Sequence, residues 1–240
     1  MLSYFPEMYQ DELLYSVIAR YHKFSGNQIK AKSIYDLFEH STMNHSIILP
    51  QYLGKLTEQT EKFGVKFDDL LKNRILFPFL TVFENDYCVS EITEWAFRGK
   101  KYFSKKNFDL WQDTSIDPCL KICPICLKEE QENFGEGYWH RLHQIPGVLV
   151  CPKHKTLLYD SFVACSKIYT DEFICPEDTS IFPPANQTAF EGDELDRYVQ
   201  LANGIQWVFD NFEAVQMIWK KFAENYNEAY LQFLYEKNLV

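Results

Sequence analysis

The chain has 240 residues, of which 46% are hydrophobic and 17% aromatic, a composition that supports a buried core and excludes disordered and fibrous classes. Its formal net charge of −10 argues against nucleic-acid binding by the chain as a whole. The charge is uneven, however, because residues 1–170 hold 20 Lys/Arg and 21 Asp/Glu, whereas residues 171–240 hold 4 and 13. The acidity therefore belongs to the C-terminal end.

The sequence contains no run of about 18 apolar residues, the minimum for a membrane span, and its N-terminus lacks the basic segment of a signal peptide. We therefore expect a cytoplasmic protein that does not enter a membrane. The seven cysteines fit this expectation. Thiols stay reduced in the cytosol, so a Cys-x-x-Cys pair there is better explained by metal binding than by a disulfide.

The first predicted elements are two helices joined by a turn. Asp11 is a suitable N-cap for the first helix, whose apolar residues recur at helical spacing until Ser25-Gly26-Asn27 supplies a stop. A second helix is predicted over residues 30–39. Such a pair is compatible with a helix-turn-helix, although any helical hairpin in a bundle produces the same pattern.

Two further helices are predicted before the middle of the chain. One covers residues 50–63, and the other covers residues 68–77 and is ended by Pro78.

A cluster of cations comes next. Five basic side chains fall within nine residues, with no acid among them and with Tyr102 and Phe103 interleaved. This pattern is compatible with a phosphate-facing patch, although such a run is more often a solvated surface. We predict that any DNA binding uses this run together with two lysines of the second helix. The predicted contacts are Arg98, Lys100, Lys101, Lys105, Lys106, Lys30 and Lys32.

The most specific pattern is a pair of short motifs, Cys-Pro-Ile-Cys and Cys-Pro-Lys-His, separated by 24 residues. In each motif two intervening residues let the chain turn back, and a proline restricts that turn, so both side chains converge on one ion. Four protein ligands close the tetrahedral shell of Zn²⁺, which is typical of structural rather than catalytic sites. We therefore predict one structural zinc ion, with Cys123, Cys126, Cys151 and His154 as its ligands.

Other cysteines and histidines offer alternatives. His140 and His143 lie three residues apart and are rival ligands, but four ligands are already supplied, so we expect them to form local hydrogen bonds. Cys165 and Cys175 offer half of a second metal site, yet neither has a Cys-x-x-Cys partner. We expect both thiols to be reduced and partly buried, and a second zinc ion is in doubt.

Residues 182–194 are polar and rich in turn formers, which predicts a linker. Beyond it, apolar residues recur at helical spacing almost to Val240, and they are too many for this stretch to stand alone. We expect these helices to pack on the rest of the chain, on another copy or on residues that this sequence lacks. The missing stop signal at the end suggests a fragment of a longer protein.

Several motifs stand in a fixed order along residues 3–160. They are Tyr4-Phe5-Pro6, the segment 11–21, Ser25-Gly26-Asn27, Cys123-Pro124-x-Cys126 and the block from Tyr138 to His154. Together they resemble the TniQ/TnsD family of transposon target-selection proteins. The resemblance implies a helix-turn-helix region, a zinc module with the four ligands named above, and a role in marking a DNA target for the transposon's AAA+ regulator and transposase. The segment after the linker resembles the start of the helical extension of TnsD-type members, which bind a specific attachment site.

We therefore predict a mainly α protein in three parts. These are a helix-turn-helix-like helical region over 1–115, a small Cys3His zinc-finger module over 116–180, and the truncated start of a helical C-terminal domain over 190–240. The expected partners are double-stranded DNA and a TnsC-like AAA+ regulator, in the bacterial cytoplasm, with no small-molecule substrate.

Two other functions compete with this prediction. A zinc-stapled adaptor that binds proteins and never touches DNA is favoured by the acidity of residues 171–240. A zinc enzyme is disfavoured, because the chain has neither the H-x-E of a nucleobase deaminase nor the H-E-x-x-H of a metalloprotease. Nor does it have a Gly-rich phosphate loop, so we expect no ATP hydrolysis by the chain itself.

Overall fold

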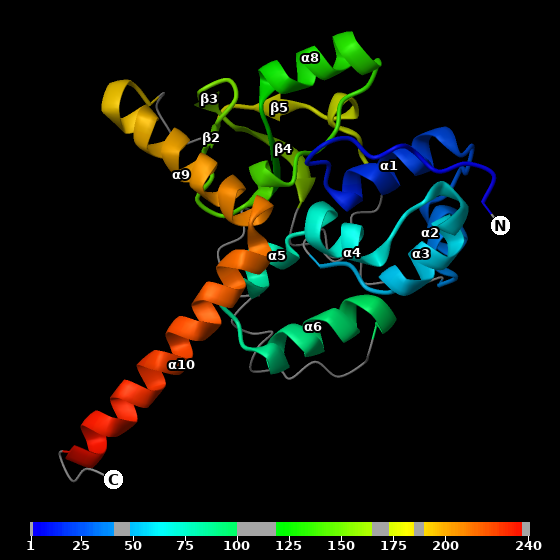
Figure 1. The fold of residues 1–240 in the computed structure, drawn as a ribbon. Coiled ribbons are helices and arrows are strands. Elements are labelled where there is room, and N and C mark those ends of the chain that lie inside the picture. The colour runs from blue at the N-terminus through cyan, green and yellow to red at the C-terminus, as the bar shows by residue number, and fades with distance from the viewer. Residues whose placement is uncertain (1, 41–48, 100–118, 165–172, 185–189, 237–240) are drawn as a thin grey trace.

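Helices form most of the described chain, and short antiparallel strands lie between residues 119 and 182 (Figure 1). The structure, a computed structural model, describes residues 2–40, 49–99, 119–164, 173–184 and 190–236, with side chains described as far as residue 226. The prediction of a mainly α protein is confirmed. None of the described helices is long and apolar enough to cross a membrane.

Two helices, α1 (Leu14–Phe24) and α2 (Lys30–Phe38), open the fold. Gly26 makes the turn between them with a φ of 76°, a left-handed conformation that favours glycine. The Asn27 amide then donates a 3.0 Å hydrogen bond to Asp36, which ties the turn to α2. The predicted pair of helices is therefore present, whereas its use as a DNA-reading helix-turn-helix stays a prediction.

The start of α1 differs from the prediction that Asp11 caps it. Leu13 occupies the N-cap position and no side chain caps the helix, while Asp11 has a left-handed φ of 55°. The cause is a tertiary contact, because the Leu13 amide donates to the Trp139 carbonyl at 2.8 Å and the Arg141 amide donates to the Asp11 carbonyl at 2.7 Å. This pairing keeps the backbone before Leu14 out of the helix, and the N-cap prediction was wrong.

Short helical segments follow. They are α3 (Leu53–Thr60), η1 (Glu61–Phe63), α4 (Phe67–Asp69), the π-helical η2 (Leu70–Arg74) and α5 (Phe77–Thr81). The helix predicted over 50–63 corresponds to α3 and η1, and the one predicted over 68–77 is interrupted after η2. Pro78 does not end a helix, because it lies in the first turn of α5, where its missing N–H leaves no hydrogen bond unmade.

Helix α6 (Asp86–Arg98) was not predicted. The Asn85 side chain caps its start by accepting a 2.9 Å hydrogen bond from the Cys88 amide. Gly99 ends it with a φ of 66°, and a Cβ at that position would collide with the Tyr52 ring. Helix α3 contacts both α2 and α6, so it lies between them.

The strands precede and follow helix α8 in the sequence. In chain order the elements are β1 (Cys119–Ile122), α8 (Pro124–Phe134), η3 (Leu142–Gln144), β2 (Val150–Cys151), β3 (Thr156–Leu157), β4 (Tyr159–Ala164), η4 (Pro176–Asp178) and β5 (Ile181–Phe182). Strand β4 pairs antiparallel with both β1 and β5, and β2 and β3 form a separate hairpin.

Two helices end the described chain, α9 (Gly192–Asp210) and α10 (Phe212–Glu236). Helix α9 contacts β2 and η3 and buries Phe209. The first turns of α10 lie beside α5 and α6, where the Trp219 indole donates a 2.7 Å hydrogen bond to the Phe83 carbonyl. The rest of α10 then extends away from the body of the molecule (Figure 1).

One cluster of buried side chains spans the first two predicted parts of the chain. It includes Leu13 and Leu37 from the N-terminal helices, and Leu120 and Trp139 from the strand region, all at 0% exposure. Phe209 of α9 belongs to the same cluster. The boundary predicted near residue 115 stays a prediction, but the regions on its two sides share a core.

Candidate metal centre and its surroundings

Two local turns bring the four predicted ligands together. Cys123 follows β1 and stands at the N-cap of α8, so Cys126 lies in the first turn of that helix. Cys151 ends β2, and His154 lies in the turn before β3. That turn is closed by a 2.8 Å hydrogen bond from the Lys155 amide to the Cys151 carbonyl. These two turns therefore place the Cys123/Cys126 pair next to the Cys151/His154 pair.

The distances among these side chains match a tetrahedral zinc site. The Nδ1 atom of His154 lies 3.4 Å from the sulfur of Cys123, 3.3 Å from that of Cys126 and 3.7 Å from that of Cys151. The sulfurs of Cys126 and Cys151 are 3.7 Å apart. Bonds of about 2.3 Å to sulfur and about 2.0 Å to nitrogen place tetrahedral ligands about 3.5–3.8 Å from each other. The donor set and its spacing both fit Zn²⁺.

The three thiols compete for protons in the absence of a cation. Hydrogen bonds from Cys123 and Cys126 lower the pKa of Cys151 to about 3, whereas hydrogen bonds to Cys123 and Cys151 raise the pKa of Cys126. All three sulfurs are almost fully buried, with exposures of 3% or less. A bound divalent cation resolves this competition, because it holds all three as thiolates.

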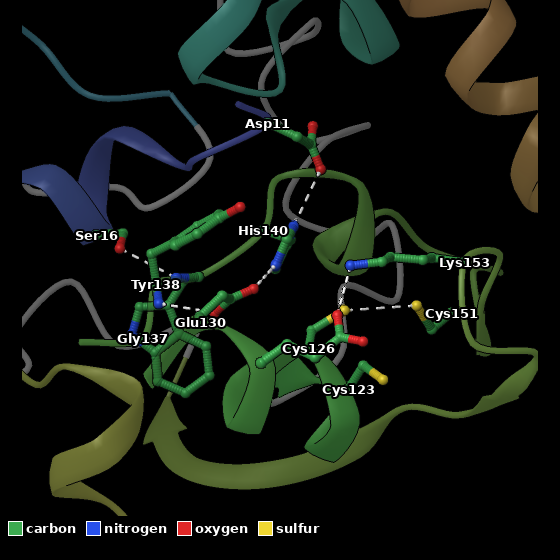
Figure 2. Close-up of polar contacts among 12 residues, drawn as sticks. Asp11, Ser16, Cys123, Cys126, Glu130, Gly137, Tyr138, His140, Cys151 and Lys153 are labelled. Carbon is green, nitrogen blue, oxygen red and sulfur yellow. Dashed lines mark hydrogen bonds and ion pairs between the residues drawn. The ribbon is translucent and has the colours of Figure 1, made fainter. Parts of the chain in front are cut away.

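His140 belongs to a second group next to the four ligands, which shares Cys126 with them: the ligand atoms of His140, Glu130 and Cys126 lie within 4.8 Å of one another. Its Nε2 atom donates a 2.6 Å hydrogen bond to Glu130 on α8, and its Nδ1 atom lies 3.8 Å from Asp11 (Figure 2). Burial lowers the pKa of His140, but the two carboxylates outweigh this effect and raise it to about 9. The ring is therefore a cation held between the N-terminal segment and α8.

The remaining rival ligands stay outside the four-residue cluster. His143 is 3% exposed, and its Nδ1 atom has no hydrogen-bond partner among the described residues. Burial and the charge of His140 lower the pKa of His143 to about 3, so it is neutral. Cys175 is buried beside Glu177 and Asp178, but Lys23 donates hydrogen bonds to both carboxylates. Cys165 lies outside the described residues, so the second metal site stays doubtful.

A buried ion-pair network lies at the junction, which is the contact between the start of α1 and the strand region. Arg20 donates to both oxygens of Glu12 at 3.1 and 3.0 Å and to Glu136 at 2.6 Å, and Glu12 is 0% exposed. The guanidinium also lies 4.3 Å from the centre of the Tyr9 ring. Sequence reasoning missed this network, although Arg20 stands at the end of an otherwise apolar run.

The predicted DNA contacts stay a prediction, and three of them lie in the described part of the chain. Lys30 lies 4.9 Å from the centre of the Phe173 ring, Lys32 pairs with Asp36 at 2.5 Å, and Arg98 pairs with Glu94 at 3.0 Å. Lys100, Lys101, Lys105 and Lys106 lie outside the described residues. The three described cations therefore already have partners within the chain, and α3 separates the helices that carry them.

A cleft of about 690 Å³ opens between α8, the Cys151–His154 turn, η2 and α9. Its wall carries four cations, one of which is the protonated His140, and four acids, so it presents no net positive surface for a phosphate. The lining charges are Arg74, Arg141, Lys153, His140, Asp11, Glu129, Glu130 and Asp210.

The family model for TniQ matches residues 3–158, which is more than half of the chain and includes α1, α2 and all four clustered ligands. The chain belongs to the TniQ family. The TniQ region therefore contains both the predicted helix-turn-helix pair and the metal cluster.

One curated relative is the Transposon Tn7 transposition protein TnsD of Escherichia coli. It is 26% identical over 163 residues, which cover 65% of this TniQ chain and 31% of the relative. The chain thus spans about a third of the length of that protein.

Proposed function

We propose that this chain is a target-selection protein for transposition, which binds target DNA and is recognised by the AAA+ regulator of the same transposon. The observation that carries the proposal is the TniQ match over residues 3–158. The similarity to a transposition protein of Tn7 agrees with it. In this proposal the zinc ion is structural and the chain has no catalytic role.

The metal has a specific part in this proposal. Ligands at the start of α8 and in the turn after β2 fix these two elements relative to each other. Helix α8 in turn holds His140 through Glu130, and the neighbouring backbone pairs with the segment before α1. In this proposal the zinc ion therefore helps to orient the N-terminal helices, which carry the predicted DNA contacts Lys30 and Lys32.

A protein adaptor that never touches DNA is the second candidate. It is favoured by the charge of residues 171–240, which hold 4 Lys/Arg and 13 Asp/Glu, and by the existing partners of Lys30, Lys32 and Arg98. In this alternative the chain bridges the AAA+ regulator to another DNA-bound protein.

A binding experiment separates the two candidates. Fluorescence anisotropy measures binding of the full chain to a duplex from the flank of an inserted transposon and to a scrambled duplex, with and without the AAA+ regulator. We expect DNA binding in both conditions and stronger binding to the flank with the regulator. Binding of the regulator without binding to either duplex would establish the adaptor instead.

Charge reversal then locates the DNA contacts. Changing Lys100 and Lys101 to Glu should weaken binding to all sequences and reduce the salt dependence by about one unit of slope for each lost phosphate contact. Lys221→Glu on α10 is the matched control and should leave the slope unchanged. An unchanged slope in the Lys100/Lys101 variant would place the DNA interface elsewhere.

A further inference from the structure

Two adjacent glutamates on α8 face different surroundings. Glu130 is buried and holds His140, as described above. Glu129 turns toward the metal cluster, where its Oε1 atom lies 3.1 Å from Nε2 of His154. Its other oxygen accepts a 2.5 Å hydrogen bond from Lys153, which is the residue before His154. The carboxylate of Glu129 is therefore fixed against the outer side of a candidate ligand.

The orientation of His154 matters because an imidazole binds metal through only one nitrogen. Here Nδ1 faces the three sulfurs at 3.3–3.7 Å, and Nε2 faces Glu129. A neutral imidazole carries its proton on the nitrogen that does not bind the metal. A carboxylate 3.1 Å from Nε2 favours the tautomer that carries the proton there, which keeps Nδ1 free for the metal.

The Lys153 ammonium holds the Glu129 carboxylate in place for this contact, since the two groups pair at 2.5 Å. Lys153 is 67% exposed and lies in the same turn as His154, so it holds the carboxylate from the solvent side. This contact gives a structural role to the lysine of the Cys-Pro-Lys-His motif.

We propose that Glu129, held by Lys153, is a positioning residue for the metal: it orients His154 so that Nδ1 completes the Cys3His site. The inference rests on the proposed metal site and adds to it a residue outside the two motifs. It concerns the affinity and lifetime of the bound metal and makes no use of the DNA or regulator partners.

The test compares zinc dissociation from the unmodified 240-residue chain and from two variants of α8. Glu129→Ala removes the acceptor, and Glu132→Ala removes an exposed glutamate whose contact with Lys128 is 3.8 Å long. Release of zinc to a chromogenic chelator is followed at constant pH. We expect Glu129→Ala to release zinc about tenfold faster than the unmodified chain. This is the lower end of the effect of such outer contacts on metal affinity, because Glu129 is 39% exposed. Glu132→Ala should match the unmodified chain.

A second measurement distinguishes positioning from a general effect on folding. Nitrogen-15 NMR of the imidazole reports which nitrogen carries the proton. In the zinc-loaded chain we expect the proton of His154 on Nε2, and in Glu129→Gln, whose amide oxygen still accepts, we expect the same tautomer and an intermediate zinc affinity.

The outcomes are separable from failure of the metal site itself. If the unmodified chain binds one zinc ion and Glu129→Ala releases it within twofold of the rate of Glu132→Ala, the positioning role is wrong while the metal site stands. If the unmodified chain binds no zinc, both the site and the positioning role are overturned.

Discussion

The junction between α1 and the metal module contrasts with the outer part of α10. At the junction, charged groups such as Glu12 and Arg20 are buried and paired, and the backbone at Leu13 bonds to that at Trp139. On α10 the reverse holds, because Phe222 and Tyr226 are 57% and 61% exposed. Buried ion pairs lose a great deal when one partner is removed, whereas exposed side chains contribute little to folding. The contrast indicates that the junction fixes the fold and that outer α10 is available for contacts.

The largest effect is expected at the metal centre, on which the junction depends. Cys126→Ser should abolish stoichiometric zinc binding and reduce the cooperativity of unfolding, because binding of structural zinc supplies about 10 kcal/mol or more in small zinc modules. Cys123→Ser and His154→Ala should behave alike. Thermal unfolding followed by circular dichroism, with parallel zinc determination, measures both effects. A variant that lacks zinc and keeps the original sharp transition would contradict the structural role.

Removal of Arg20 should have the next largest effect. Arg20→Ala leaves Glu12, which is 0% exposed, without its countercharge, and we expect a loss of about 3–5 kcal/mol in the free energy of unfolding. Lys128→Ala is the matched control, because it breaks an exposed pair and should cost less than about 1 kcal/mol. Urea unfolding of zinc-saturated protein gives both values. Equal losses in the free energy of unfolding would show that the buried pair at the junction contributes no more than an exposed surface pair.

The charge of His140 should make the junction sensitive to high pH. Its pKa is about 9 in the folded chain against 6.5 when unperturbed, so its contribution is complete below pH 6.5 and is lost as the pH rises through 9. We expect the stability difference between the unmodified chain and His140→Gln to fall from on the order of 3 kcal/mol at pH 6 to near zero at pH 9.5. Urea unfolding with saturating zinc measures it at each pH. A difference that does not change with pH would show that His140 is not held as a cation.

The smallest effect on stability is expected from truncation of α10. A chain that ends after Lys221 keeps the hydrogen bond from Trp219 to Phe83, and we expect its free energy of unfolding to change by less than about 0.5 kcal/mol. Phe212→Ala on the same helix should cost about 3 kcal/mol, because Phe212 is buried against Phe77. Urea unfolding compares the two.

Truncation also tests which surface the partner uses. We predict that the C-terminal helices provide part of the surface for the AAA+ regulator, so truncation after Lys221 should weaken binding at least about tenfold. The truncation leaves α9 in place, so Phe209 stays in the shared core. If the shortened chain remains soluble and monomeric and binds the regulator with undiminished affinity, outer α10 is not the partner surface.

The metal cluster could be predicted from the sequence because its geometry is mostly local. Each motif forms its own turn, and the spacing of Cys123 and Cys126 alone places both in one helical turn. Helix α6 also had local signals that were not used, since Asn85 caps its start and Gly99 ends it. Both features follow from short-range backbone geometry.

The junction could not be predicted in the same way, because its contacts join segments far apart in the sequence. Asp11 has the right chemistry for an N-cap, yet it accepts hydrogen bonds from Arg141 and Leu142 instead. The pairing of His140 with Glu130 likewise depends on how α8 packs. Tertiary contacts decided these roles, and local propensity gave no information about them.

Zinc content is the most direct test of how this molecule is held together. Inductively coupled plasma mass spectrometry should find one zinc ion per chain in protein purified without chelator, and none above background in Cys126→Ser prepared in parallel. Less than about half a zinc ion per chain in the unmodified protein would contradict a structural Cys3His site.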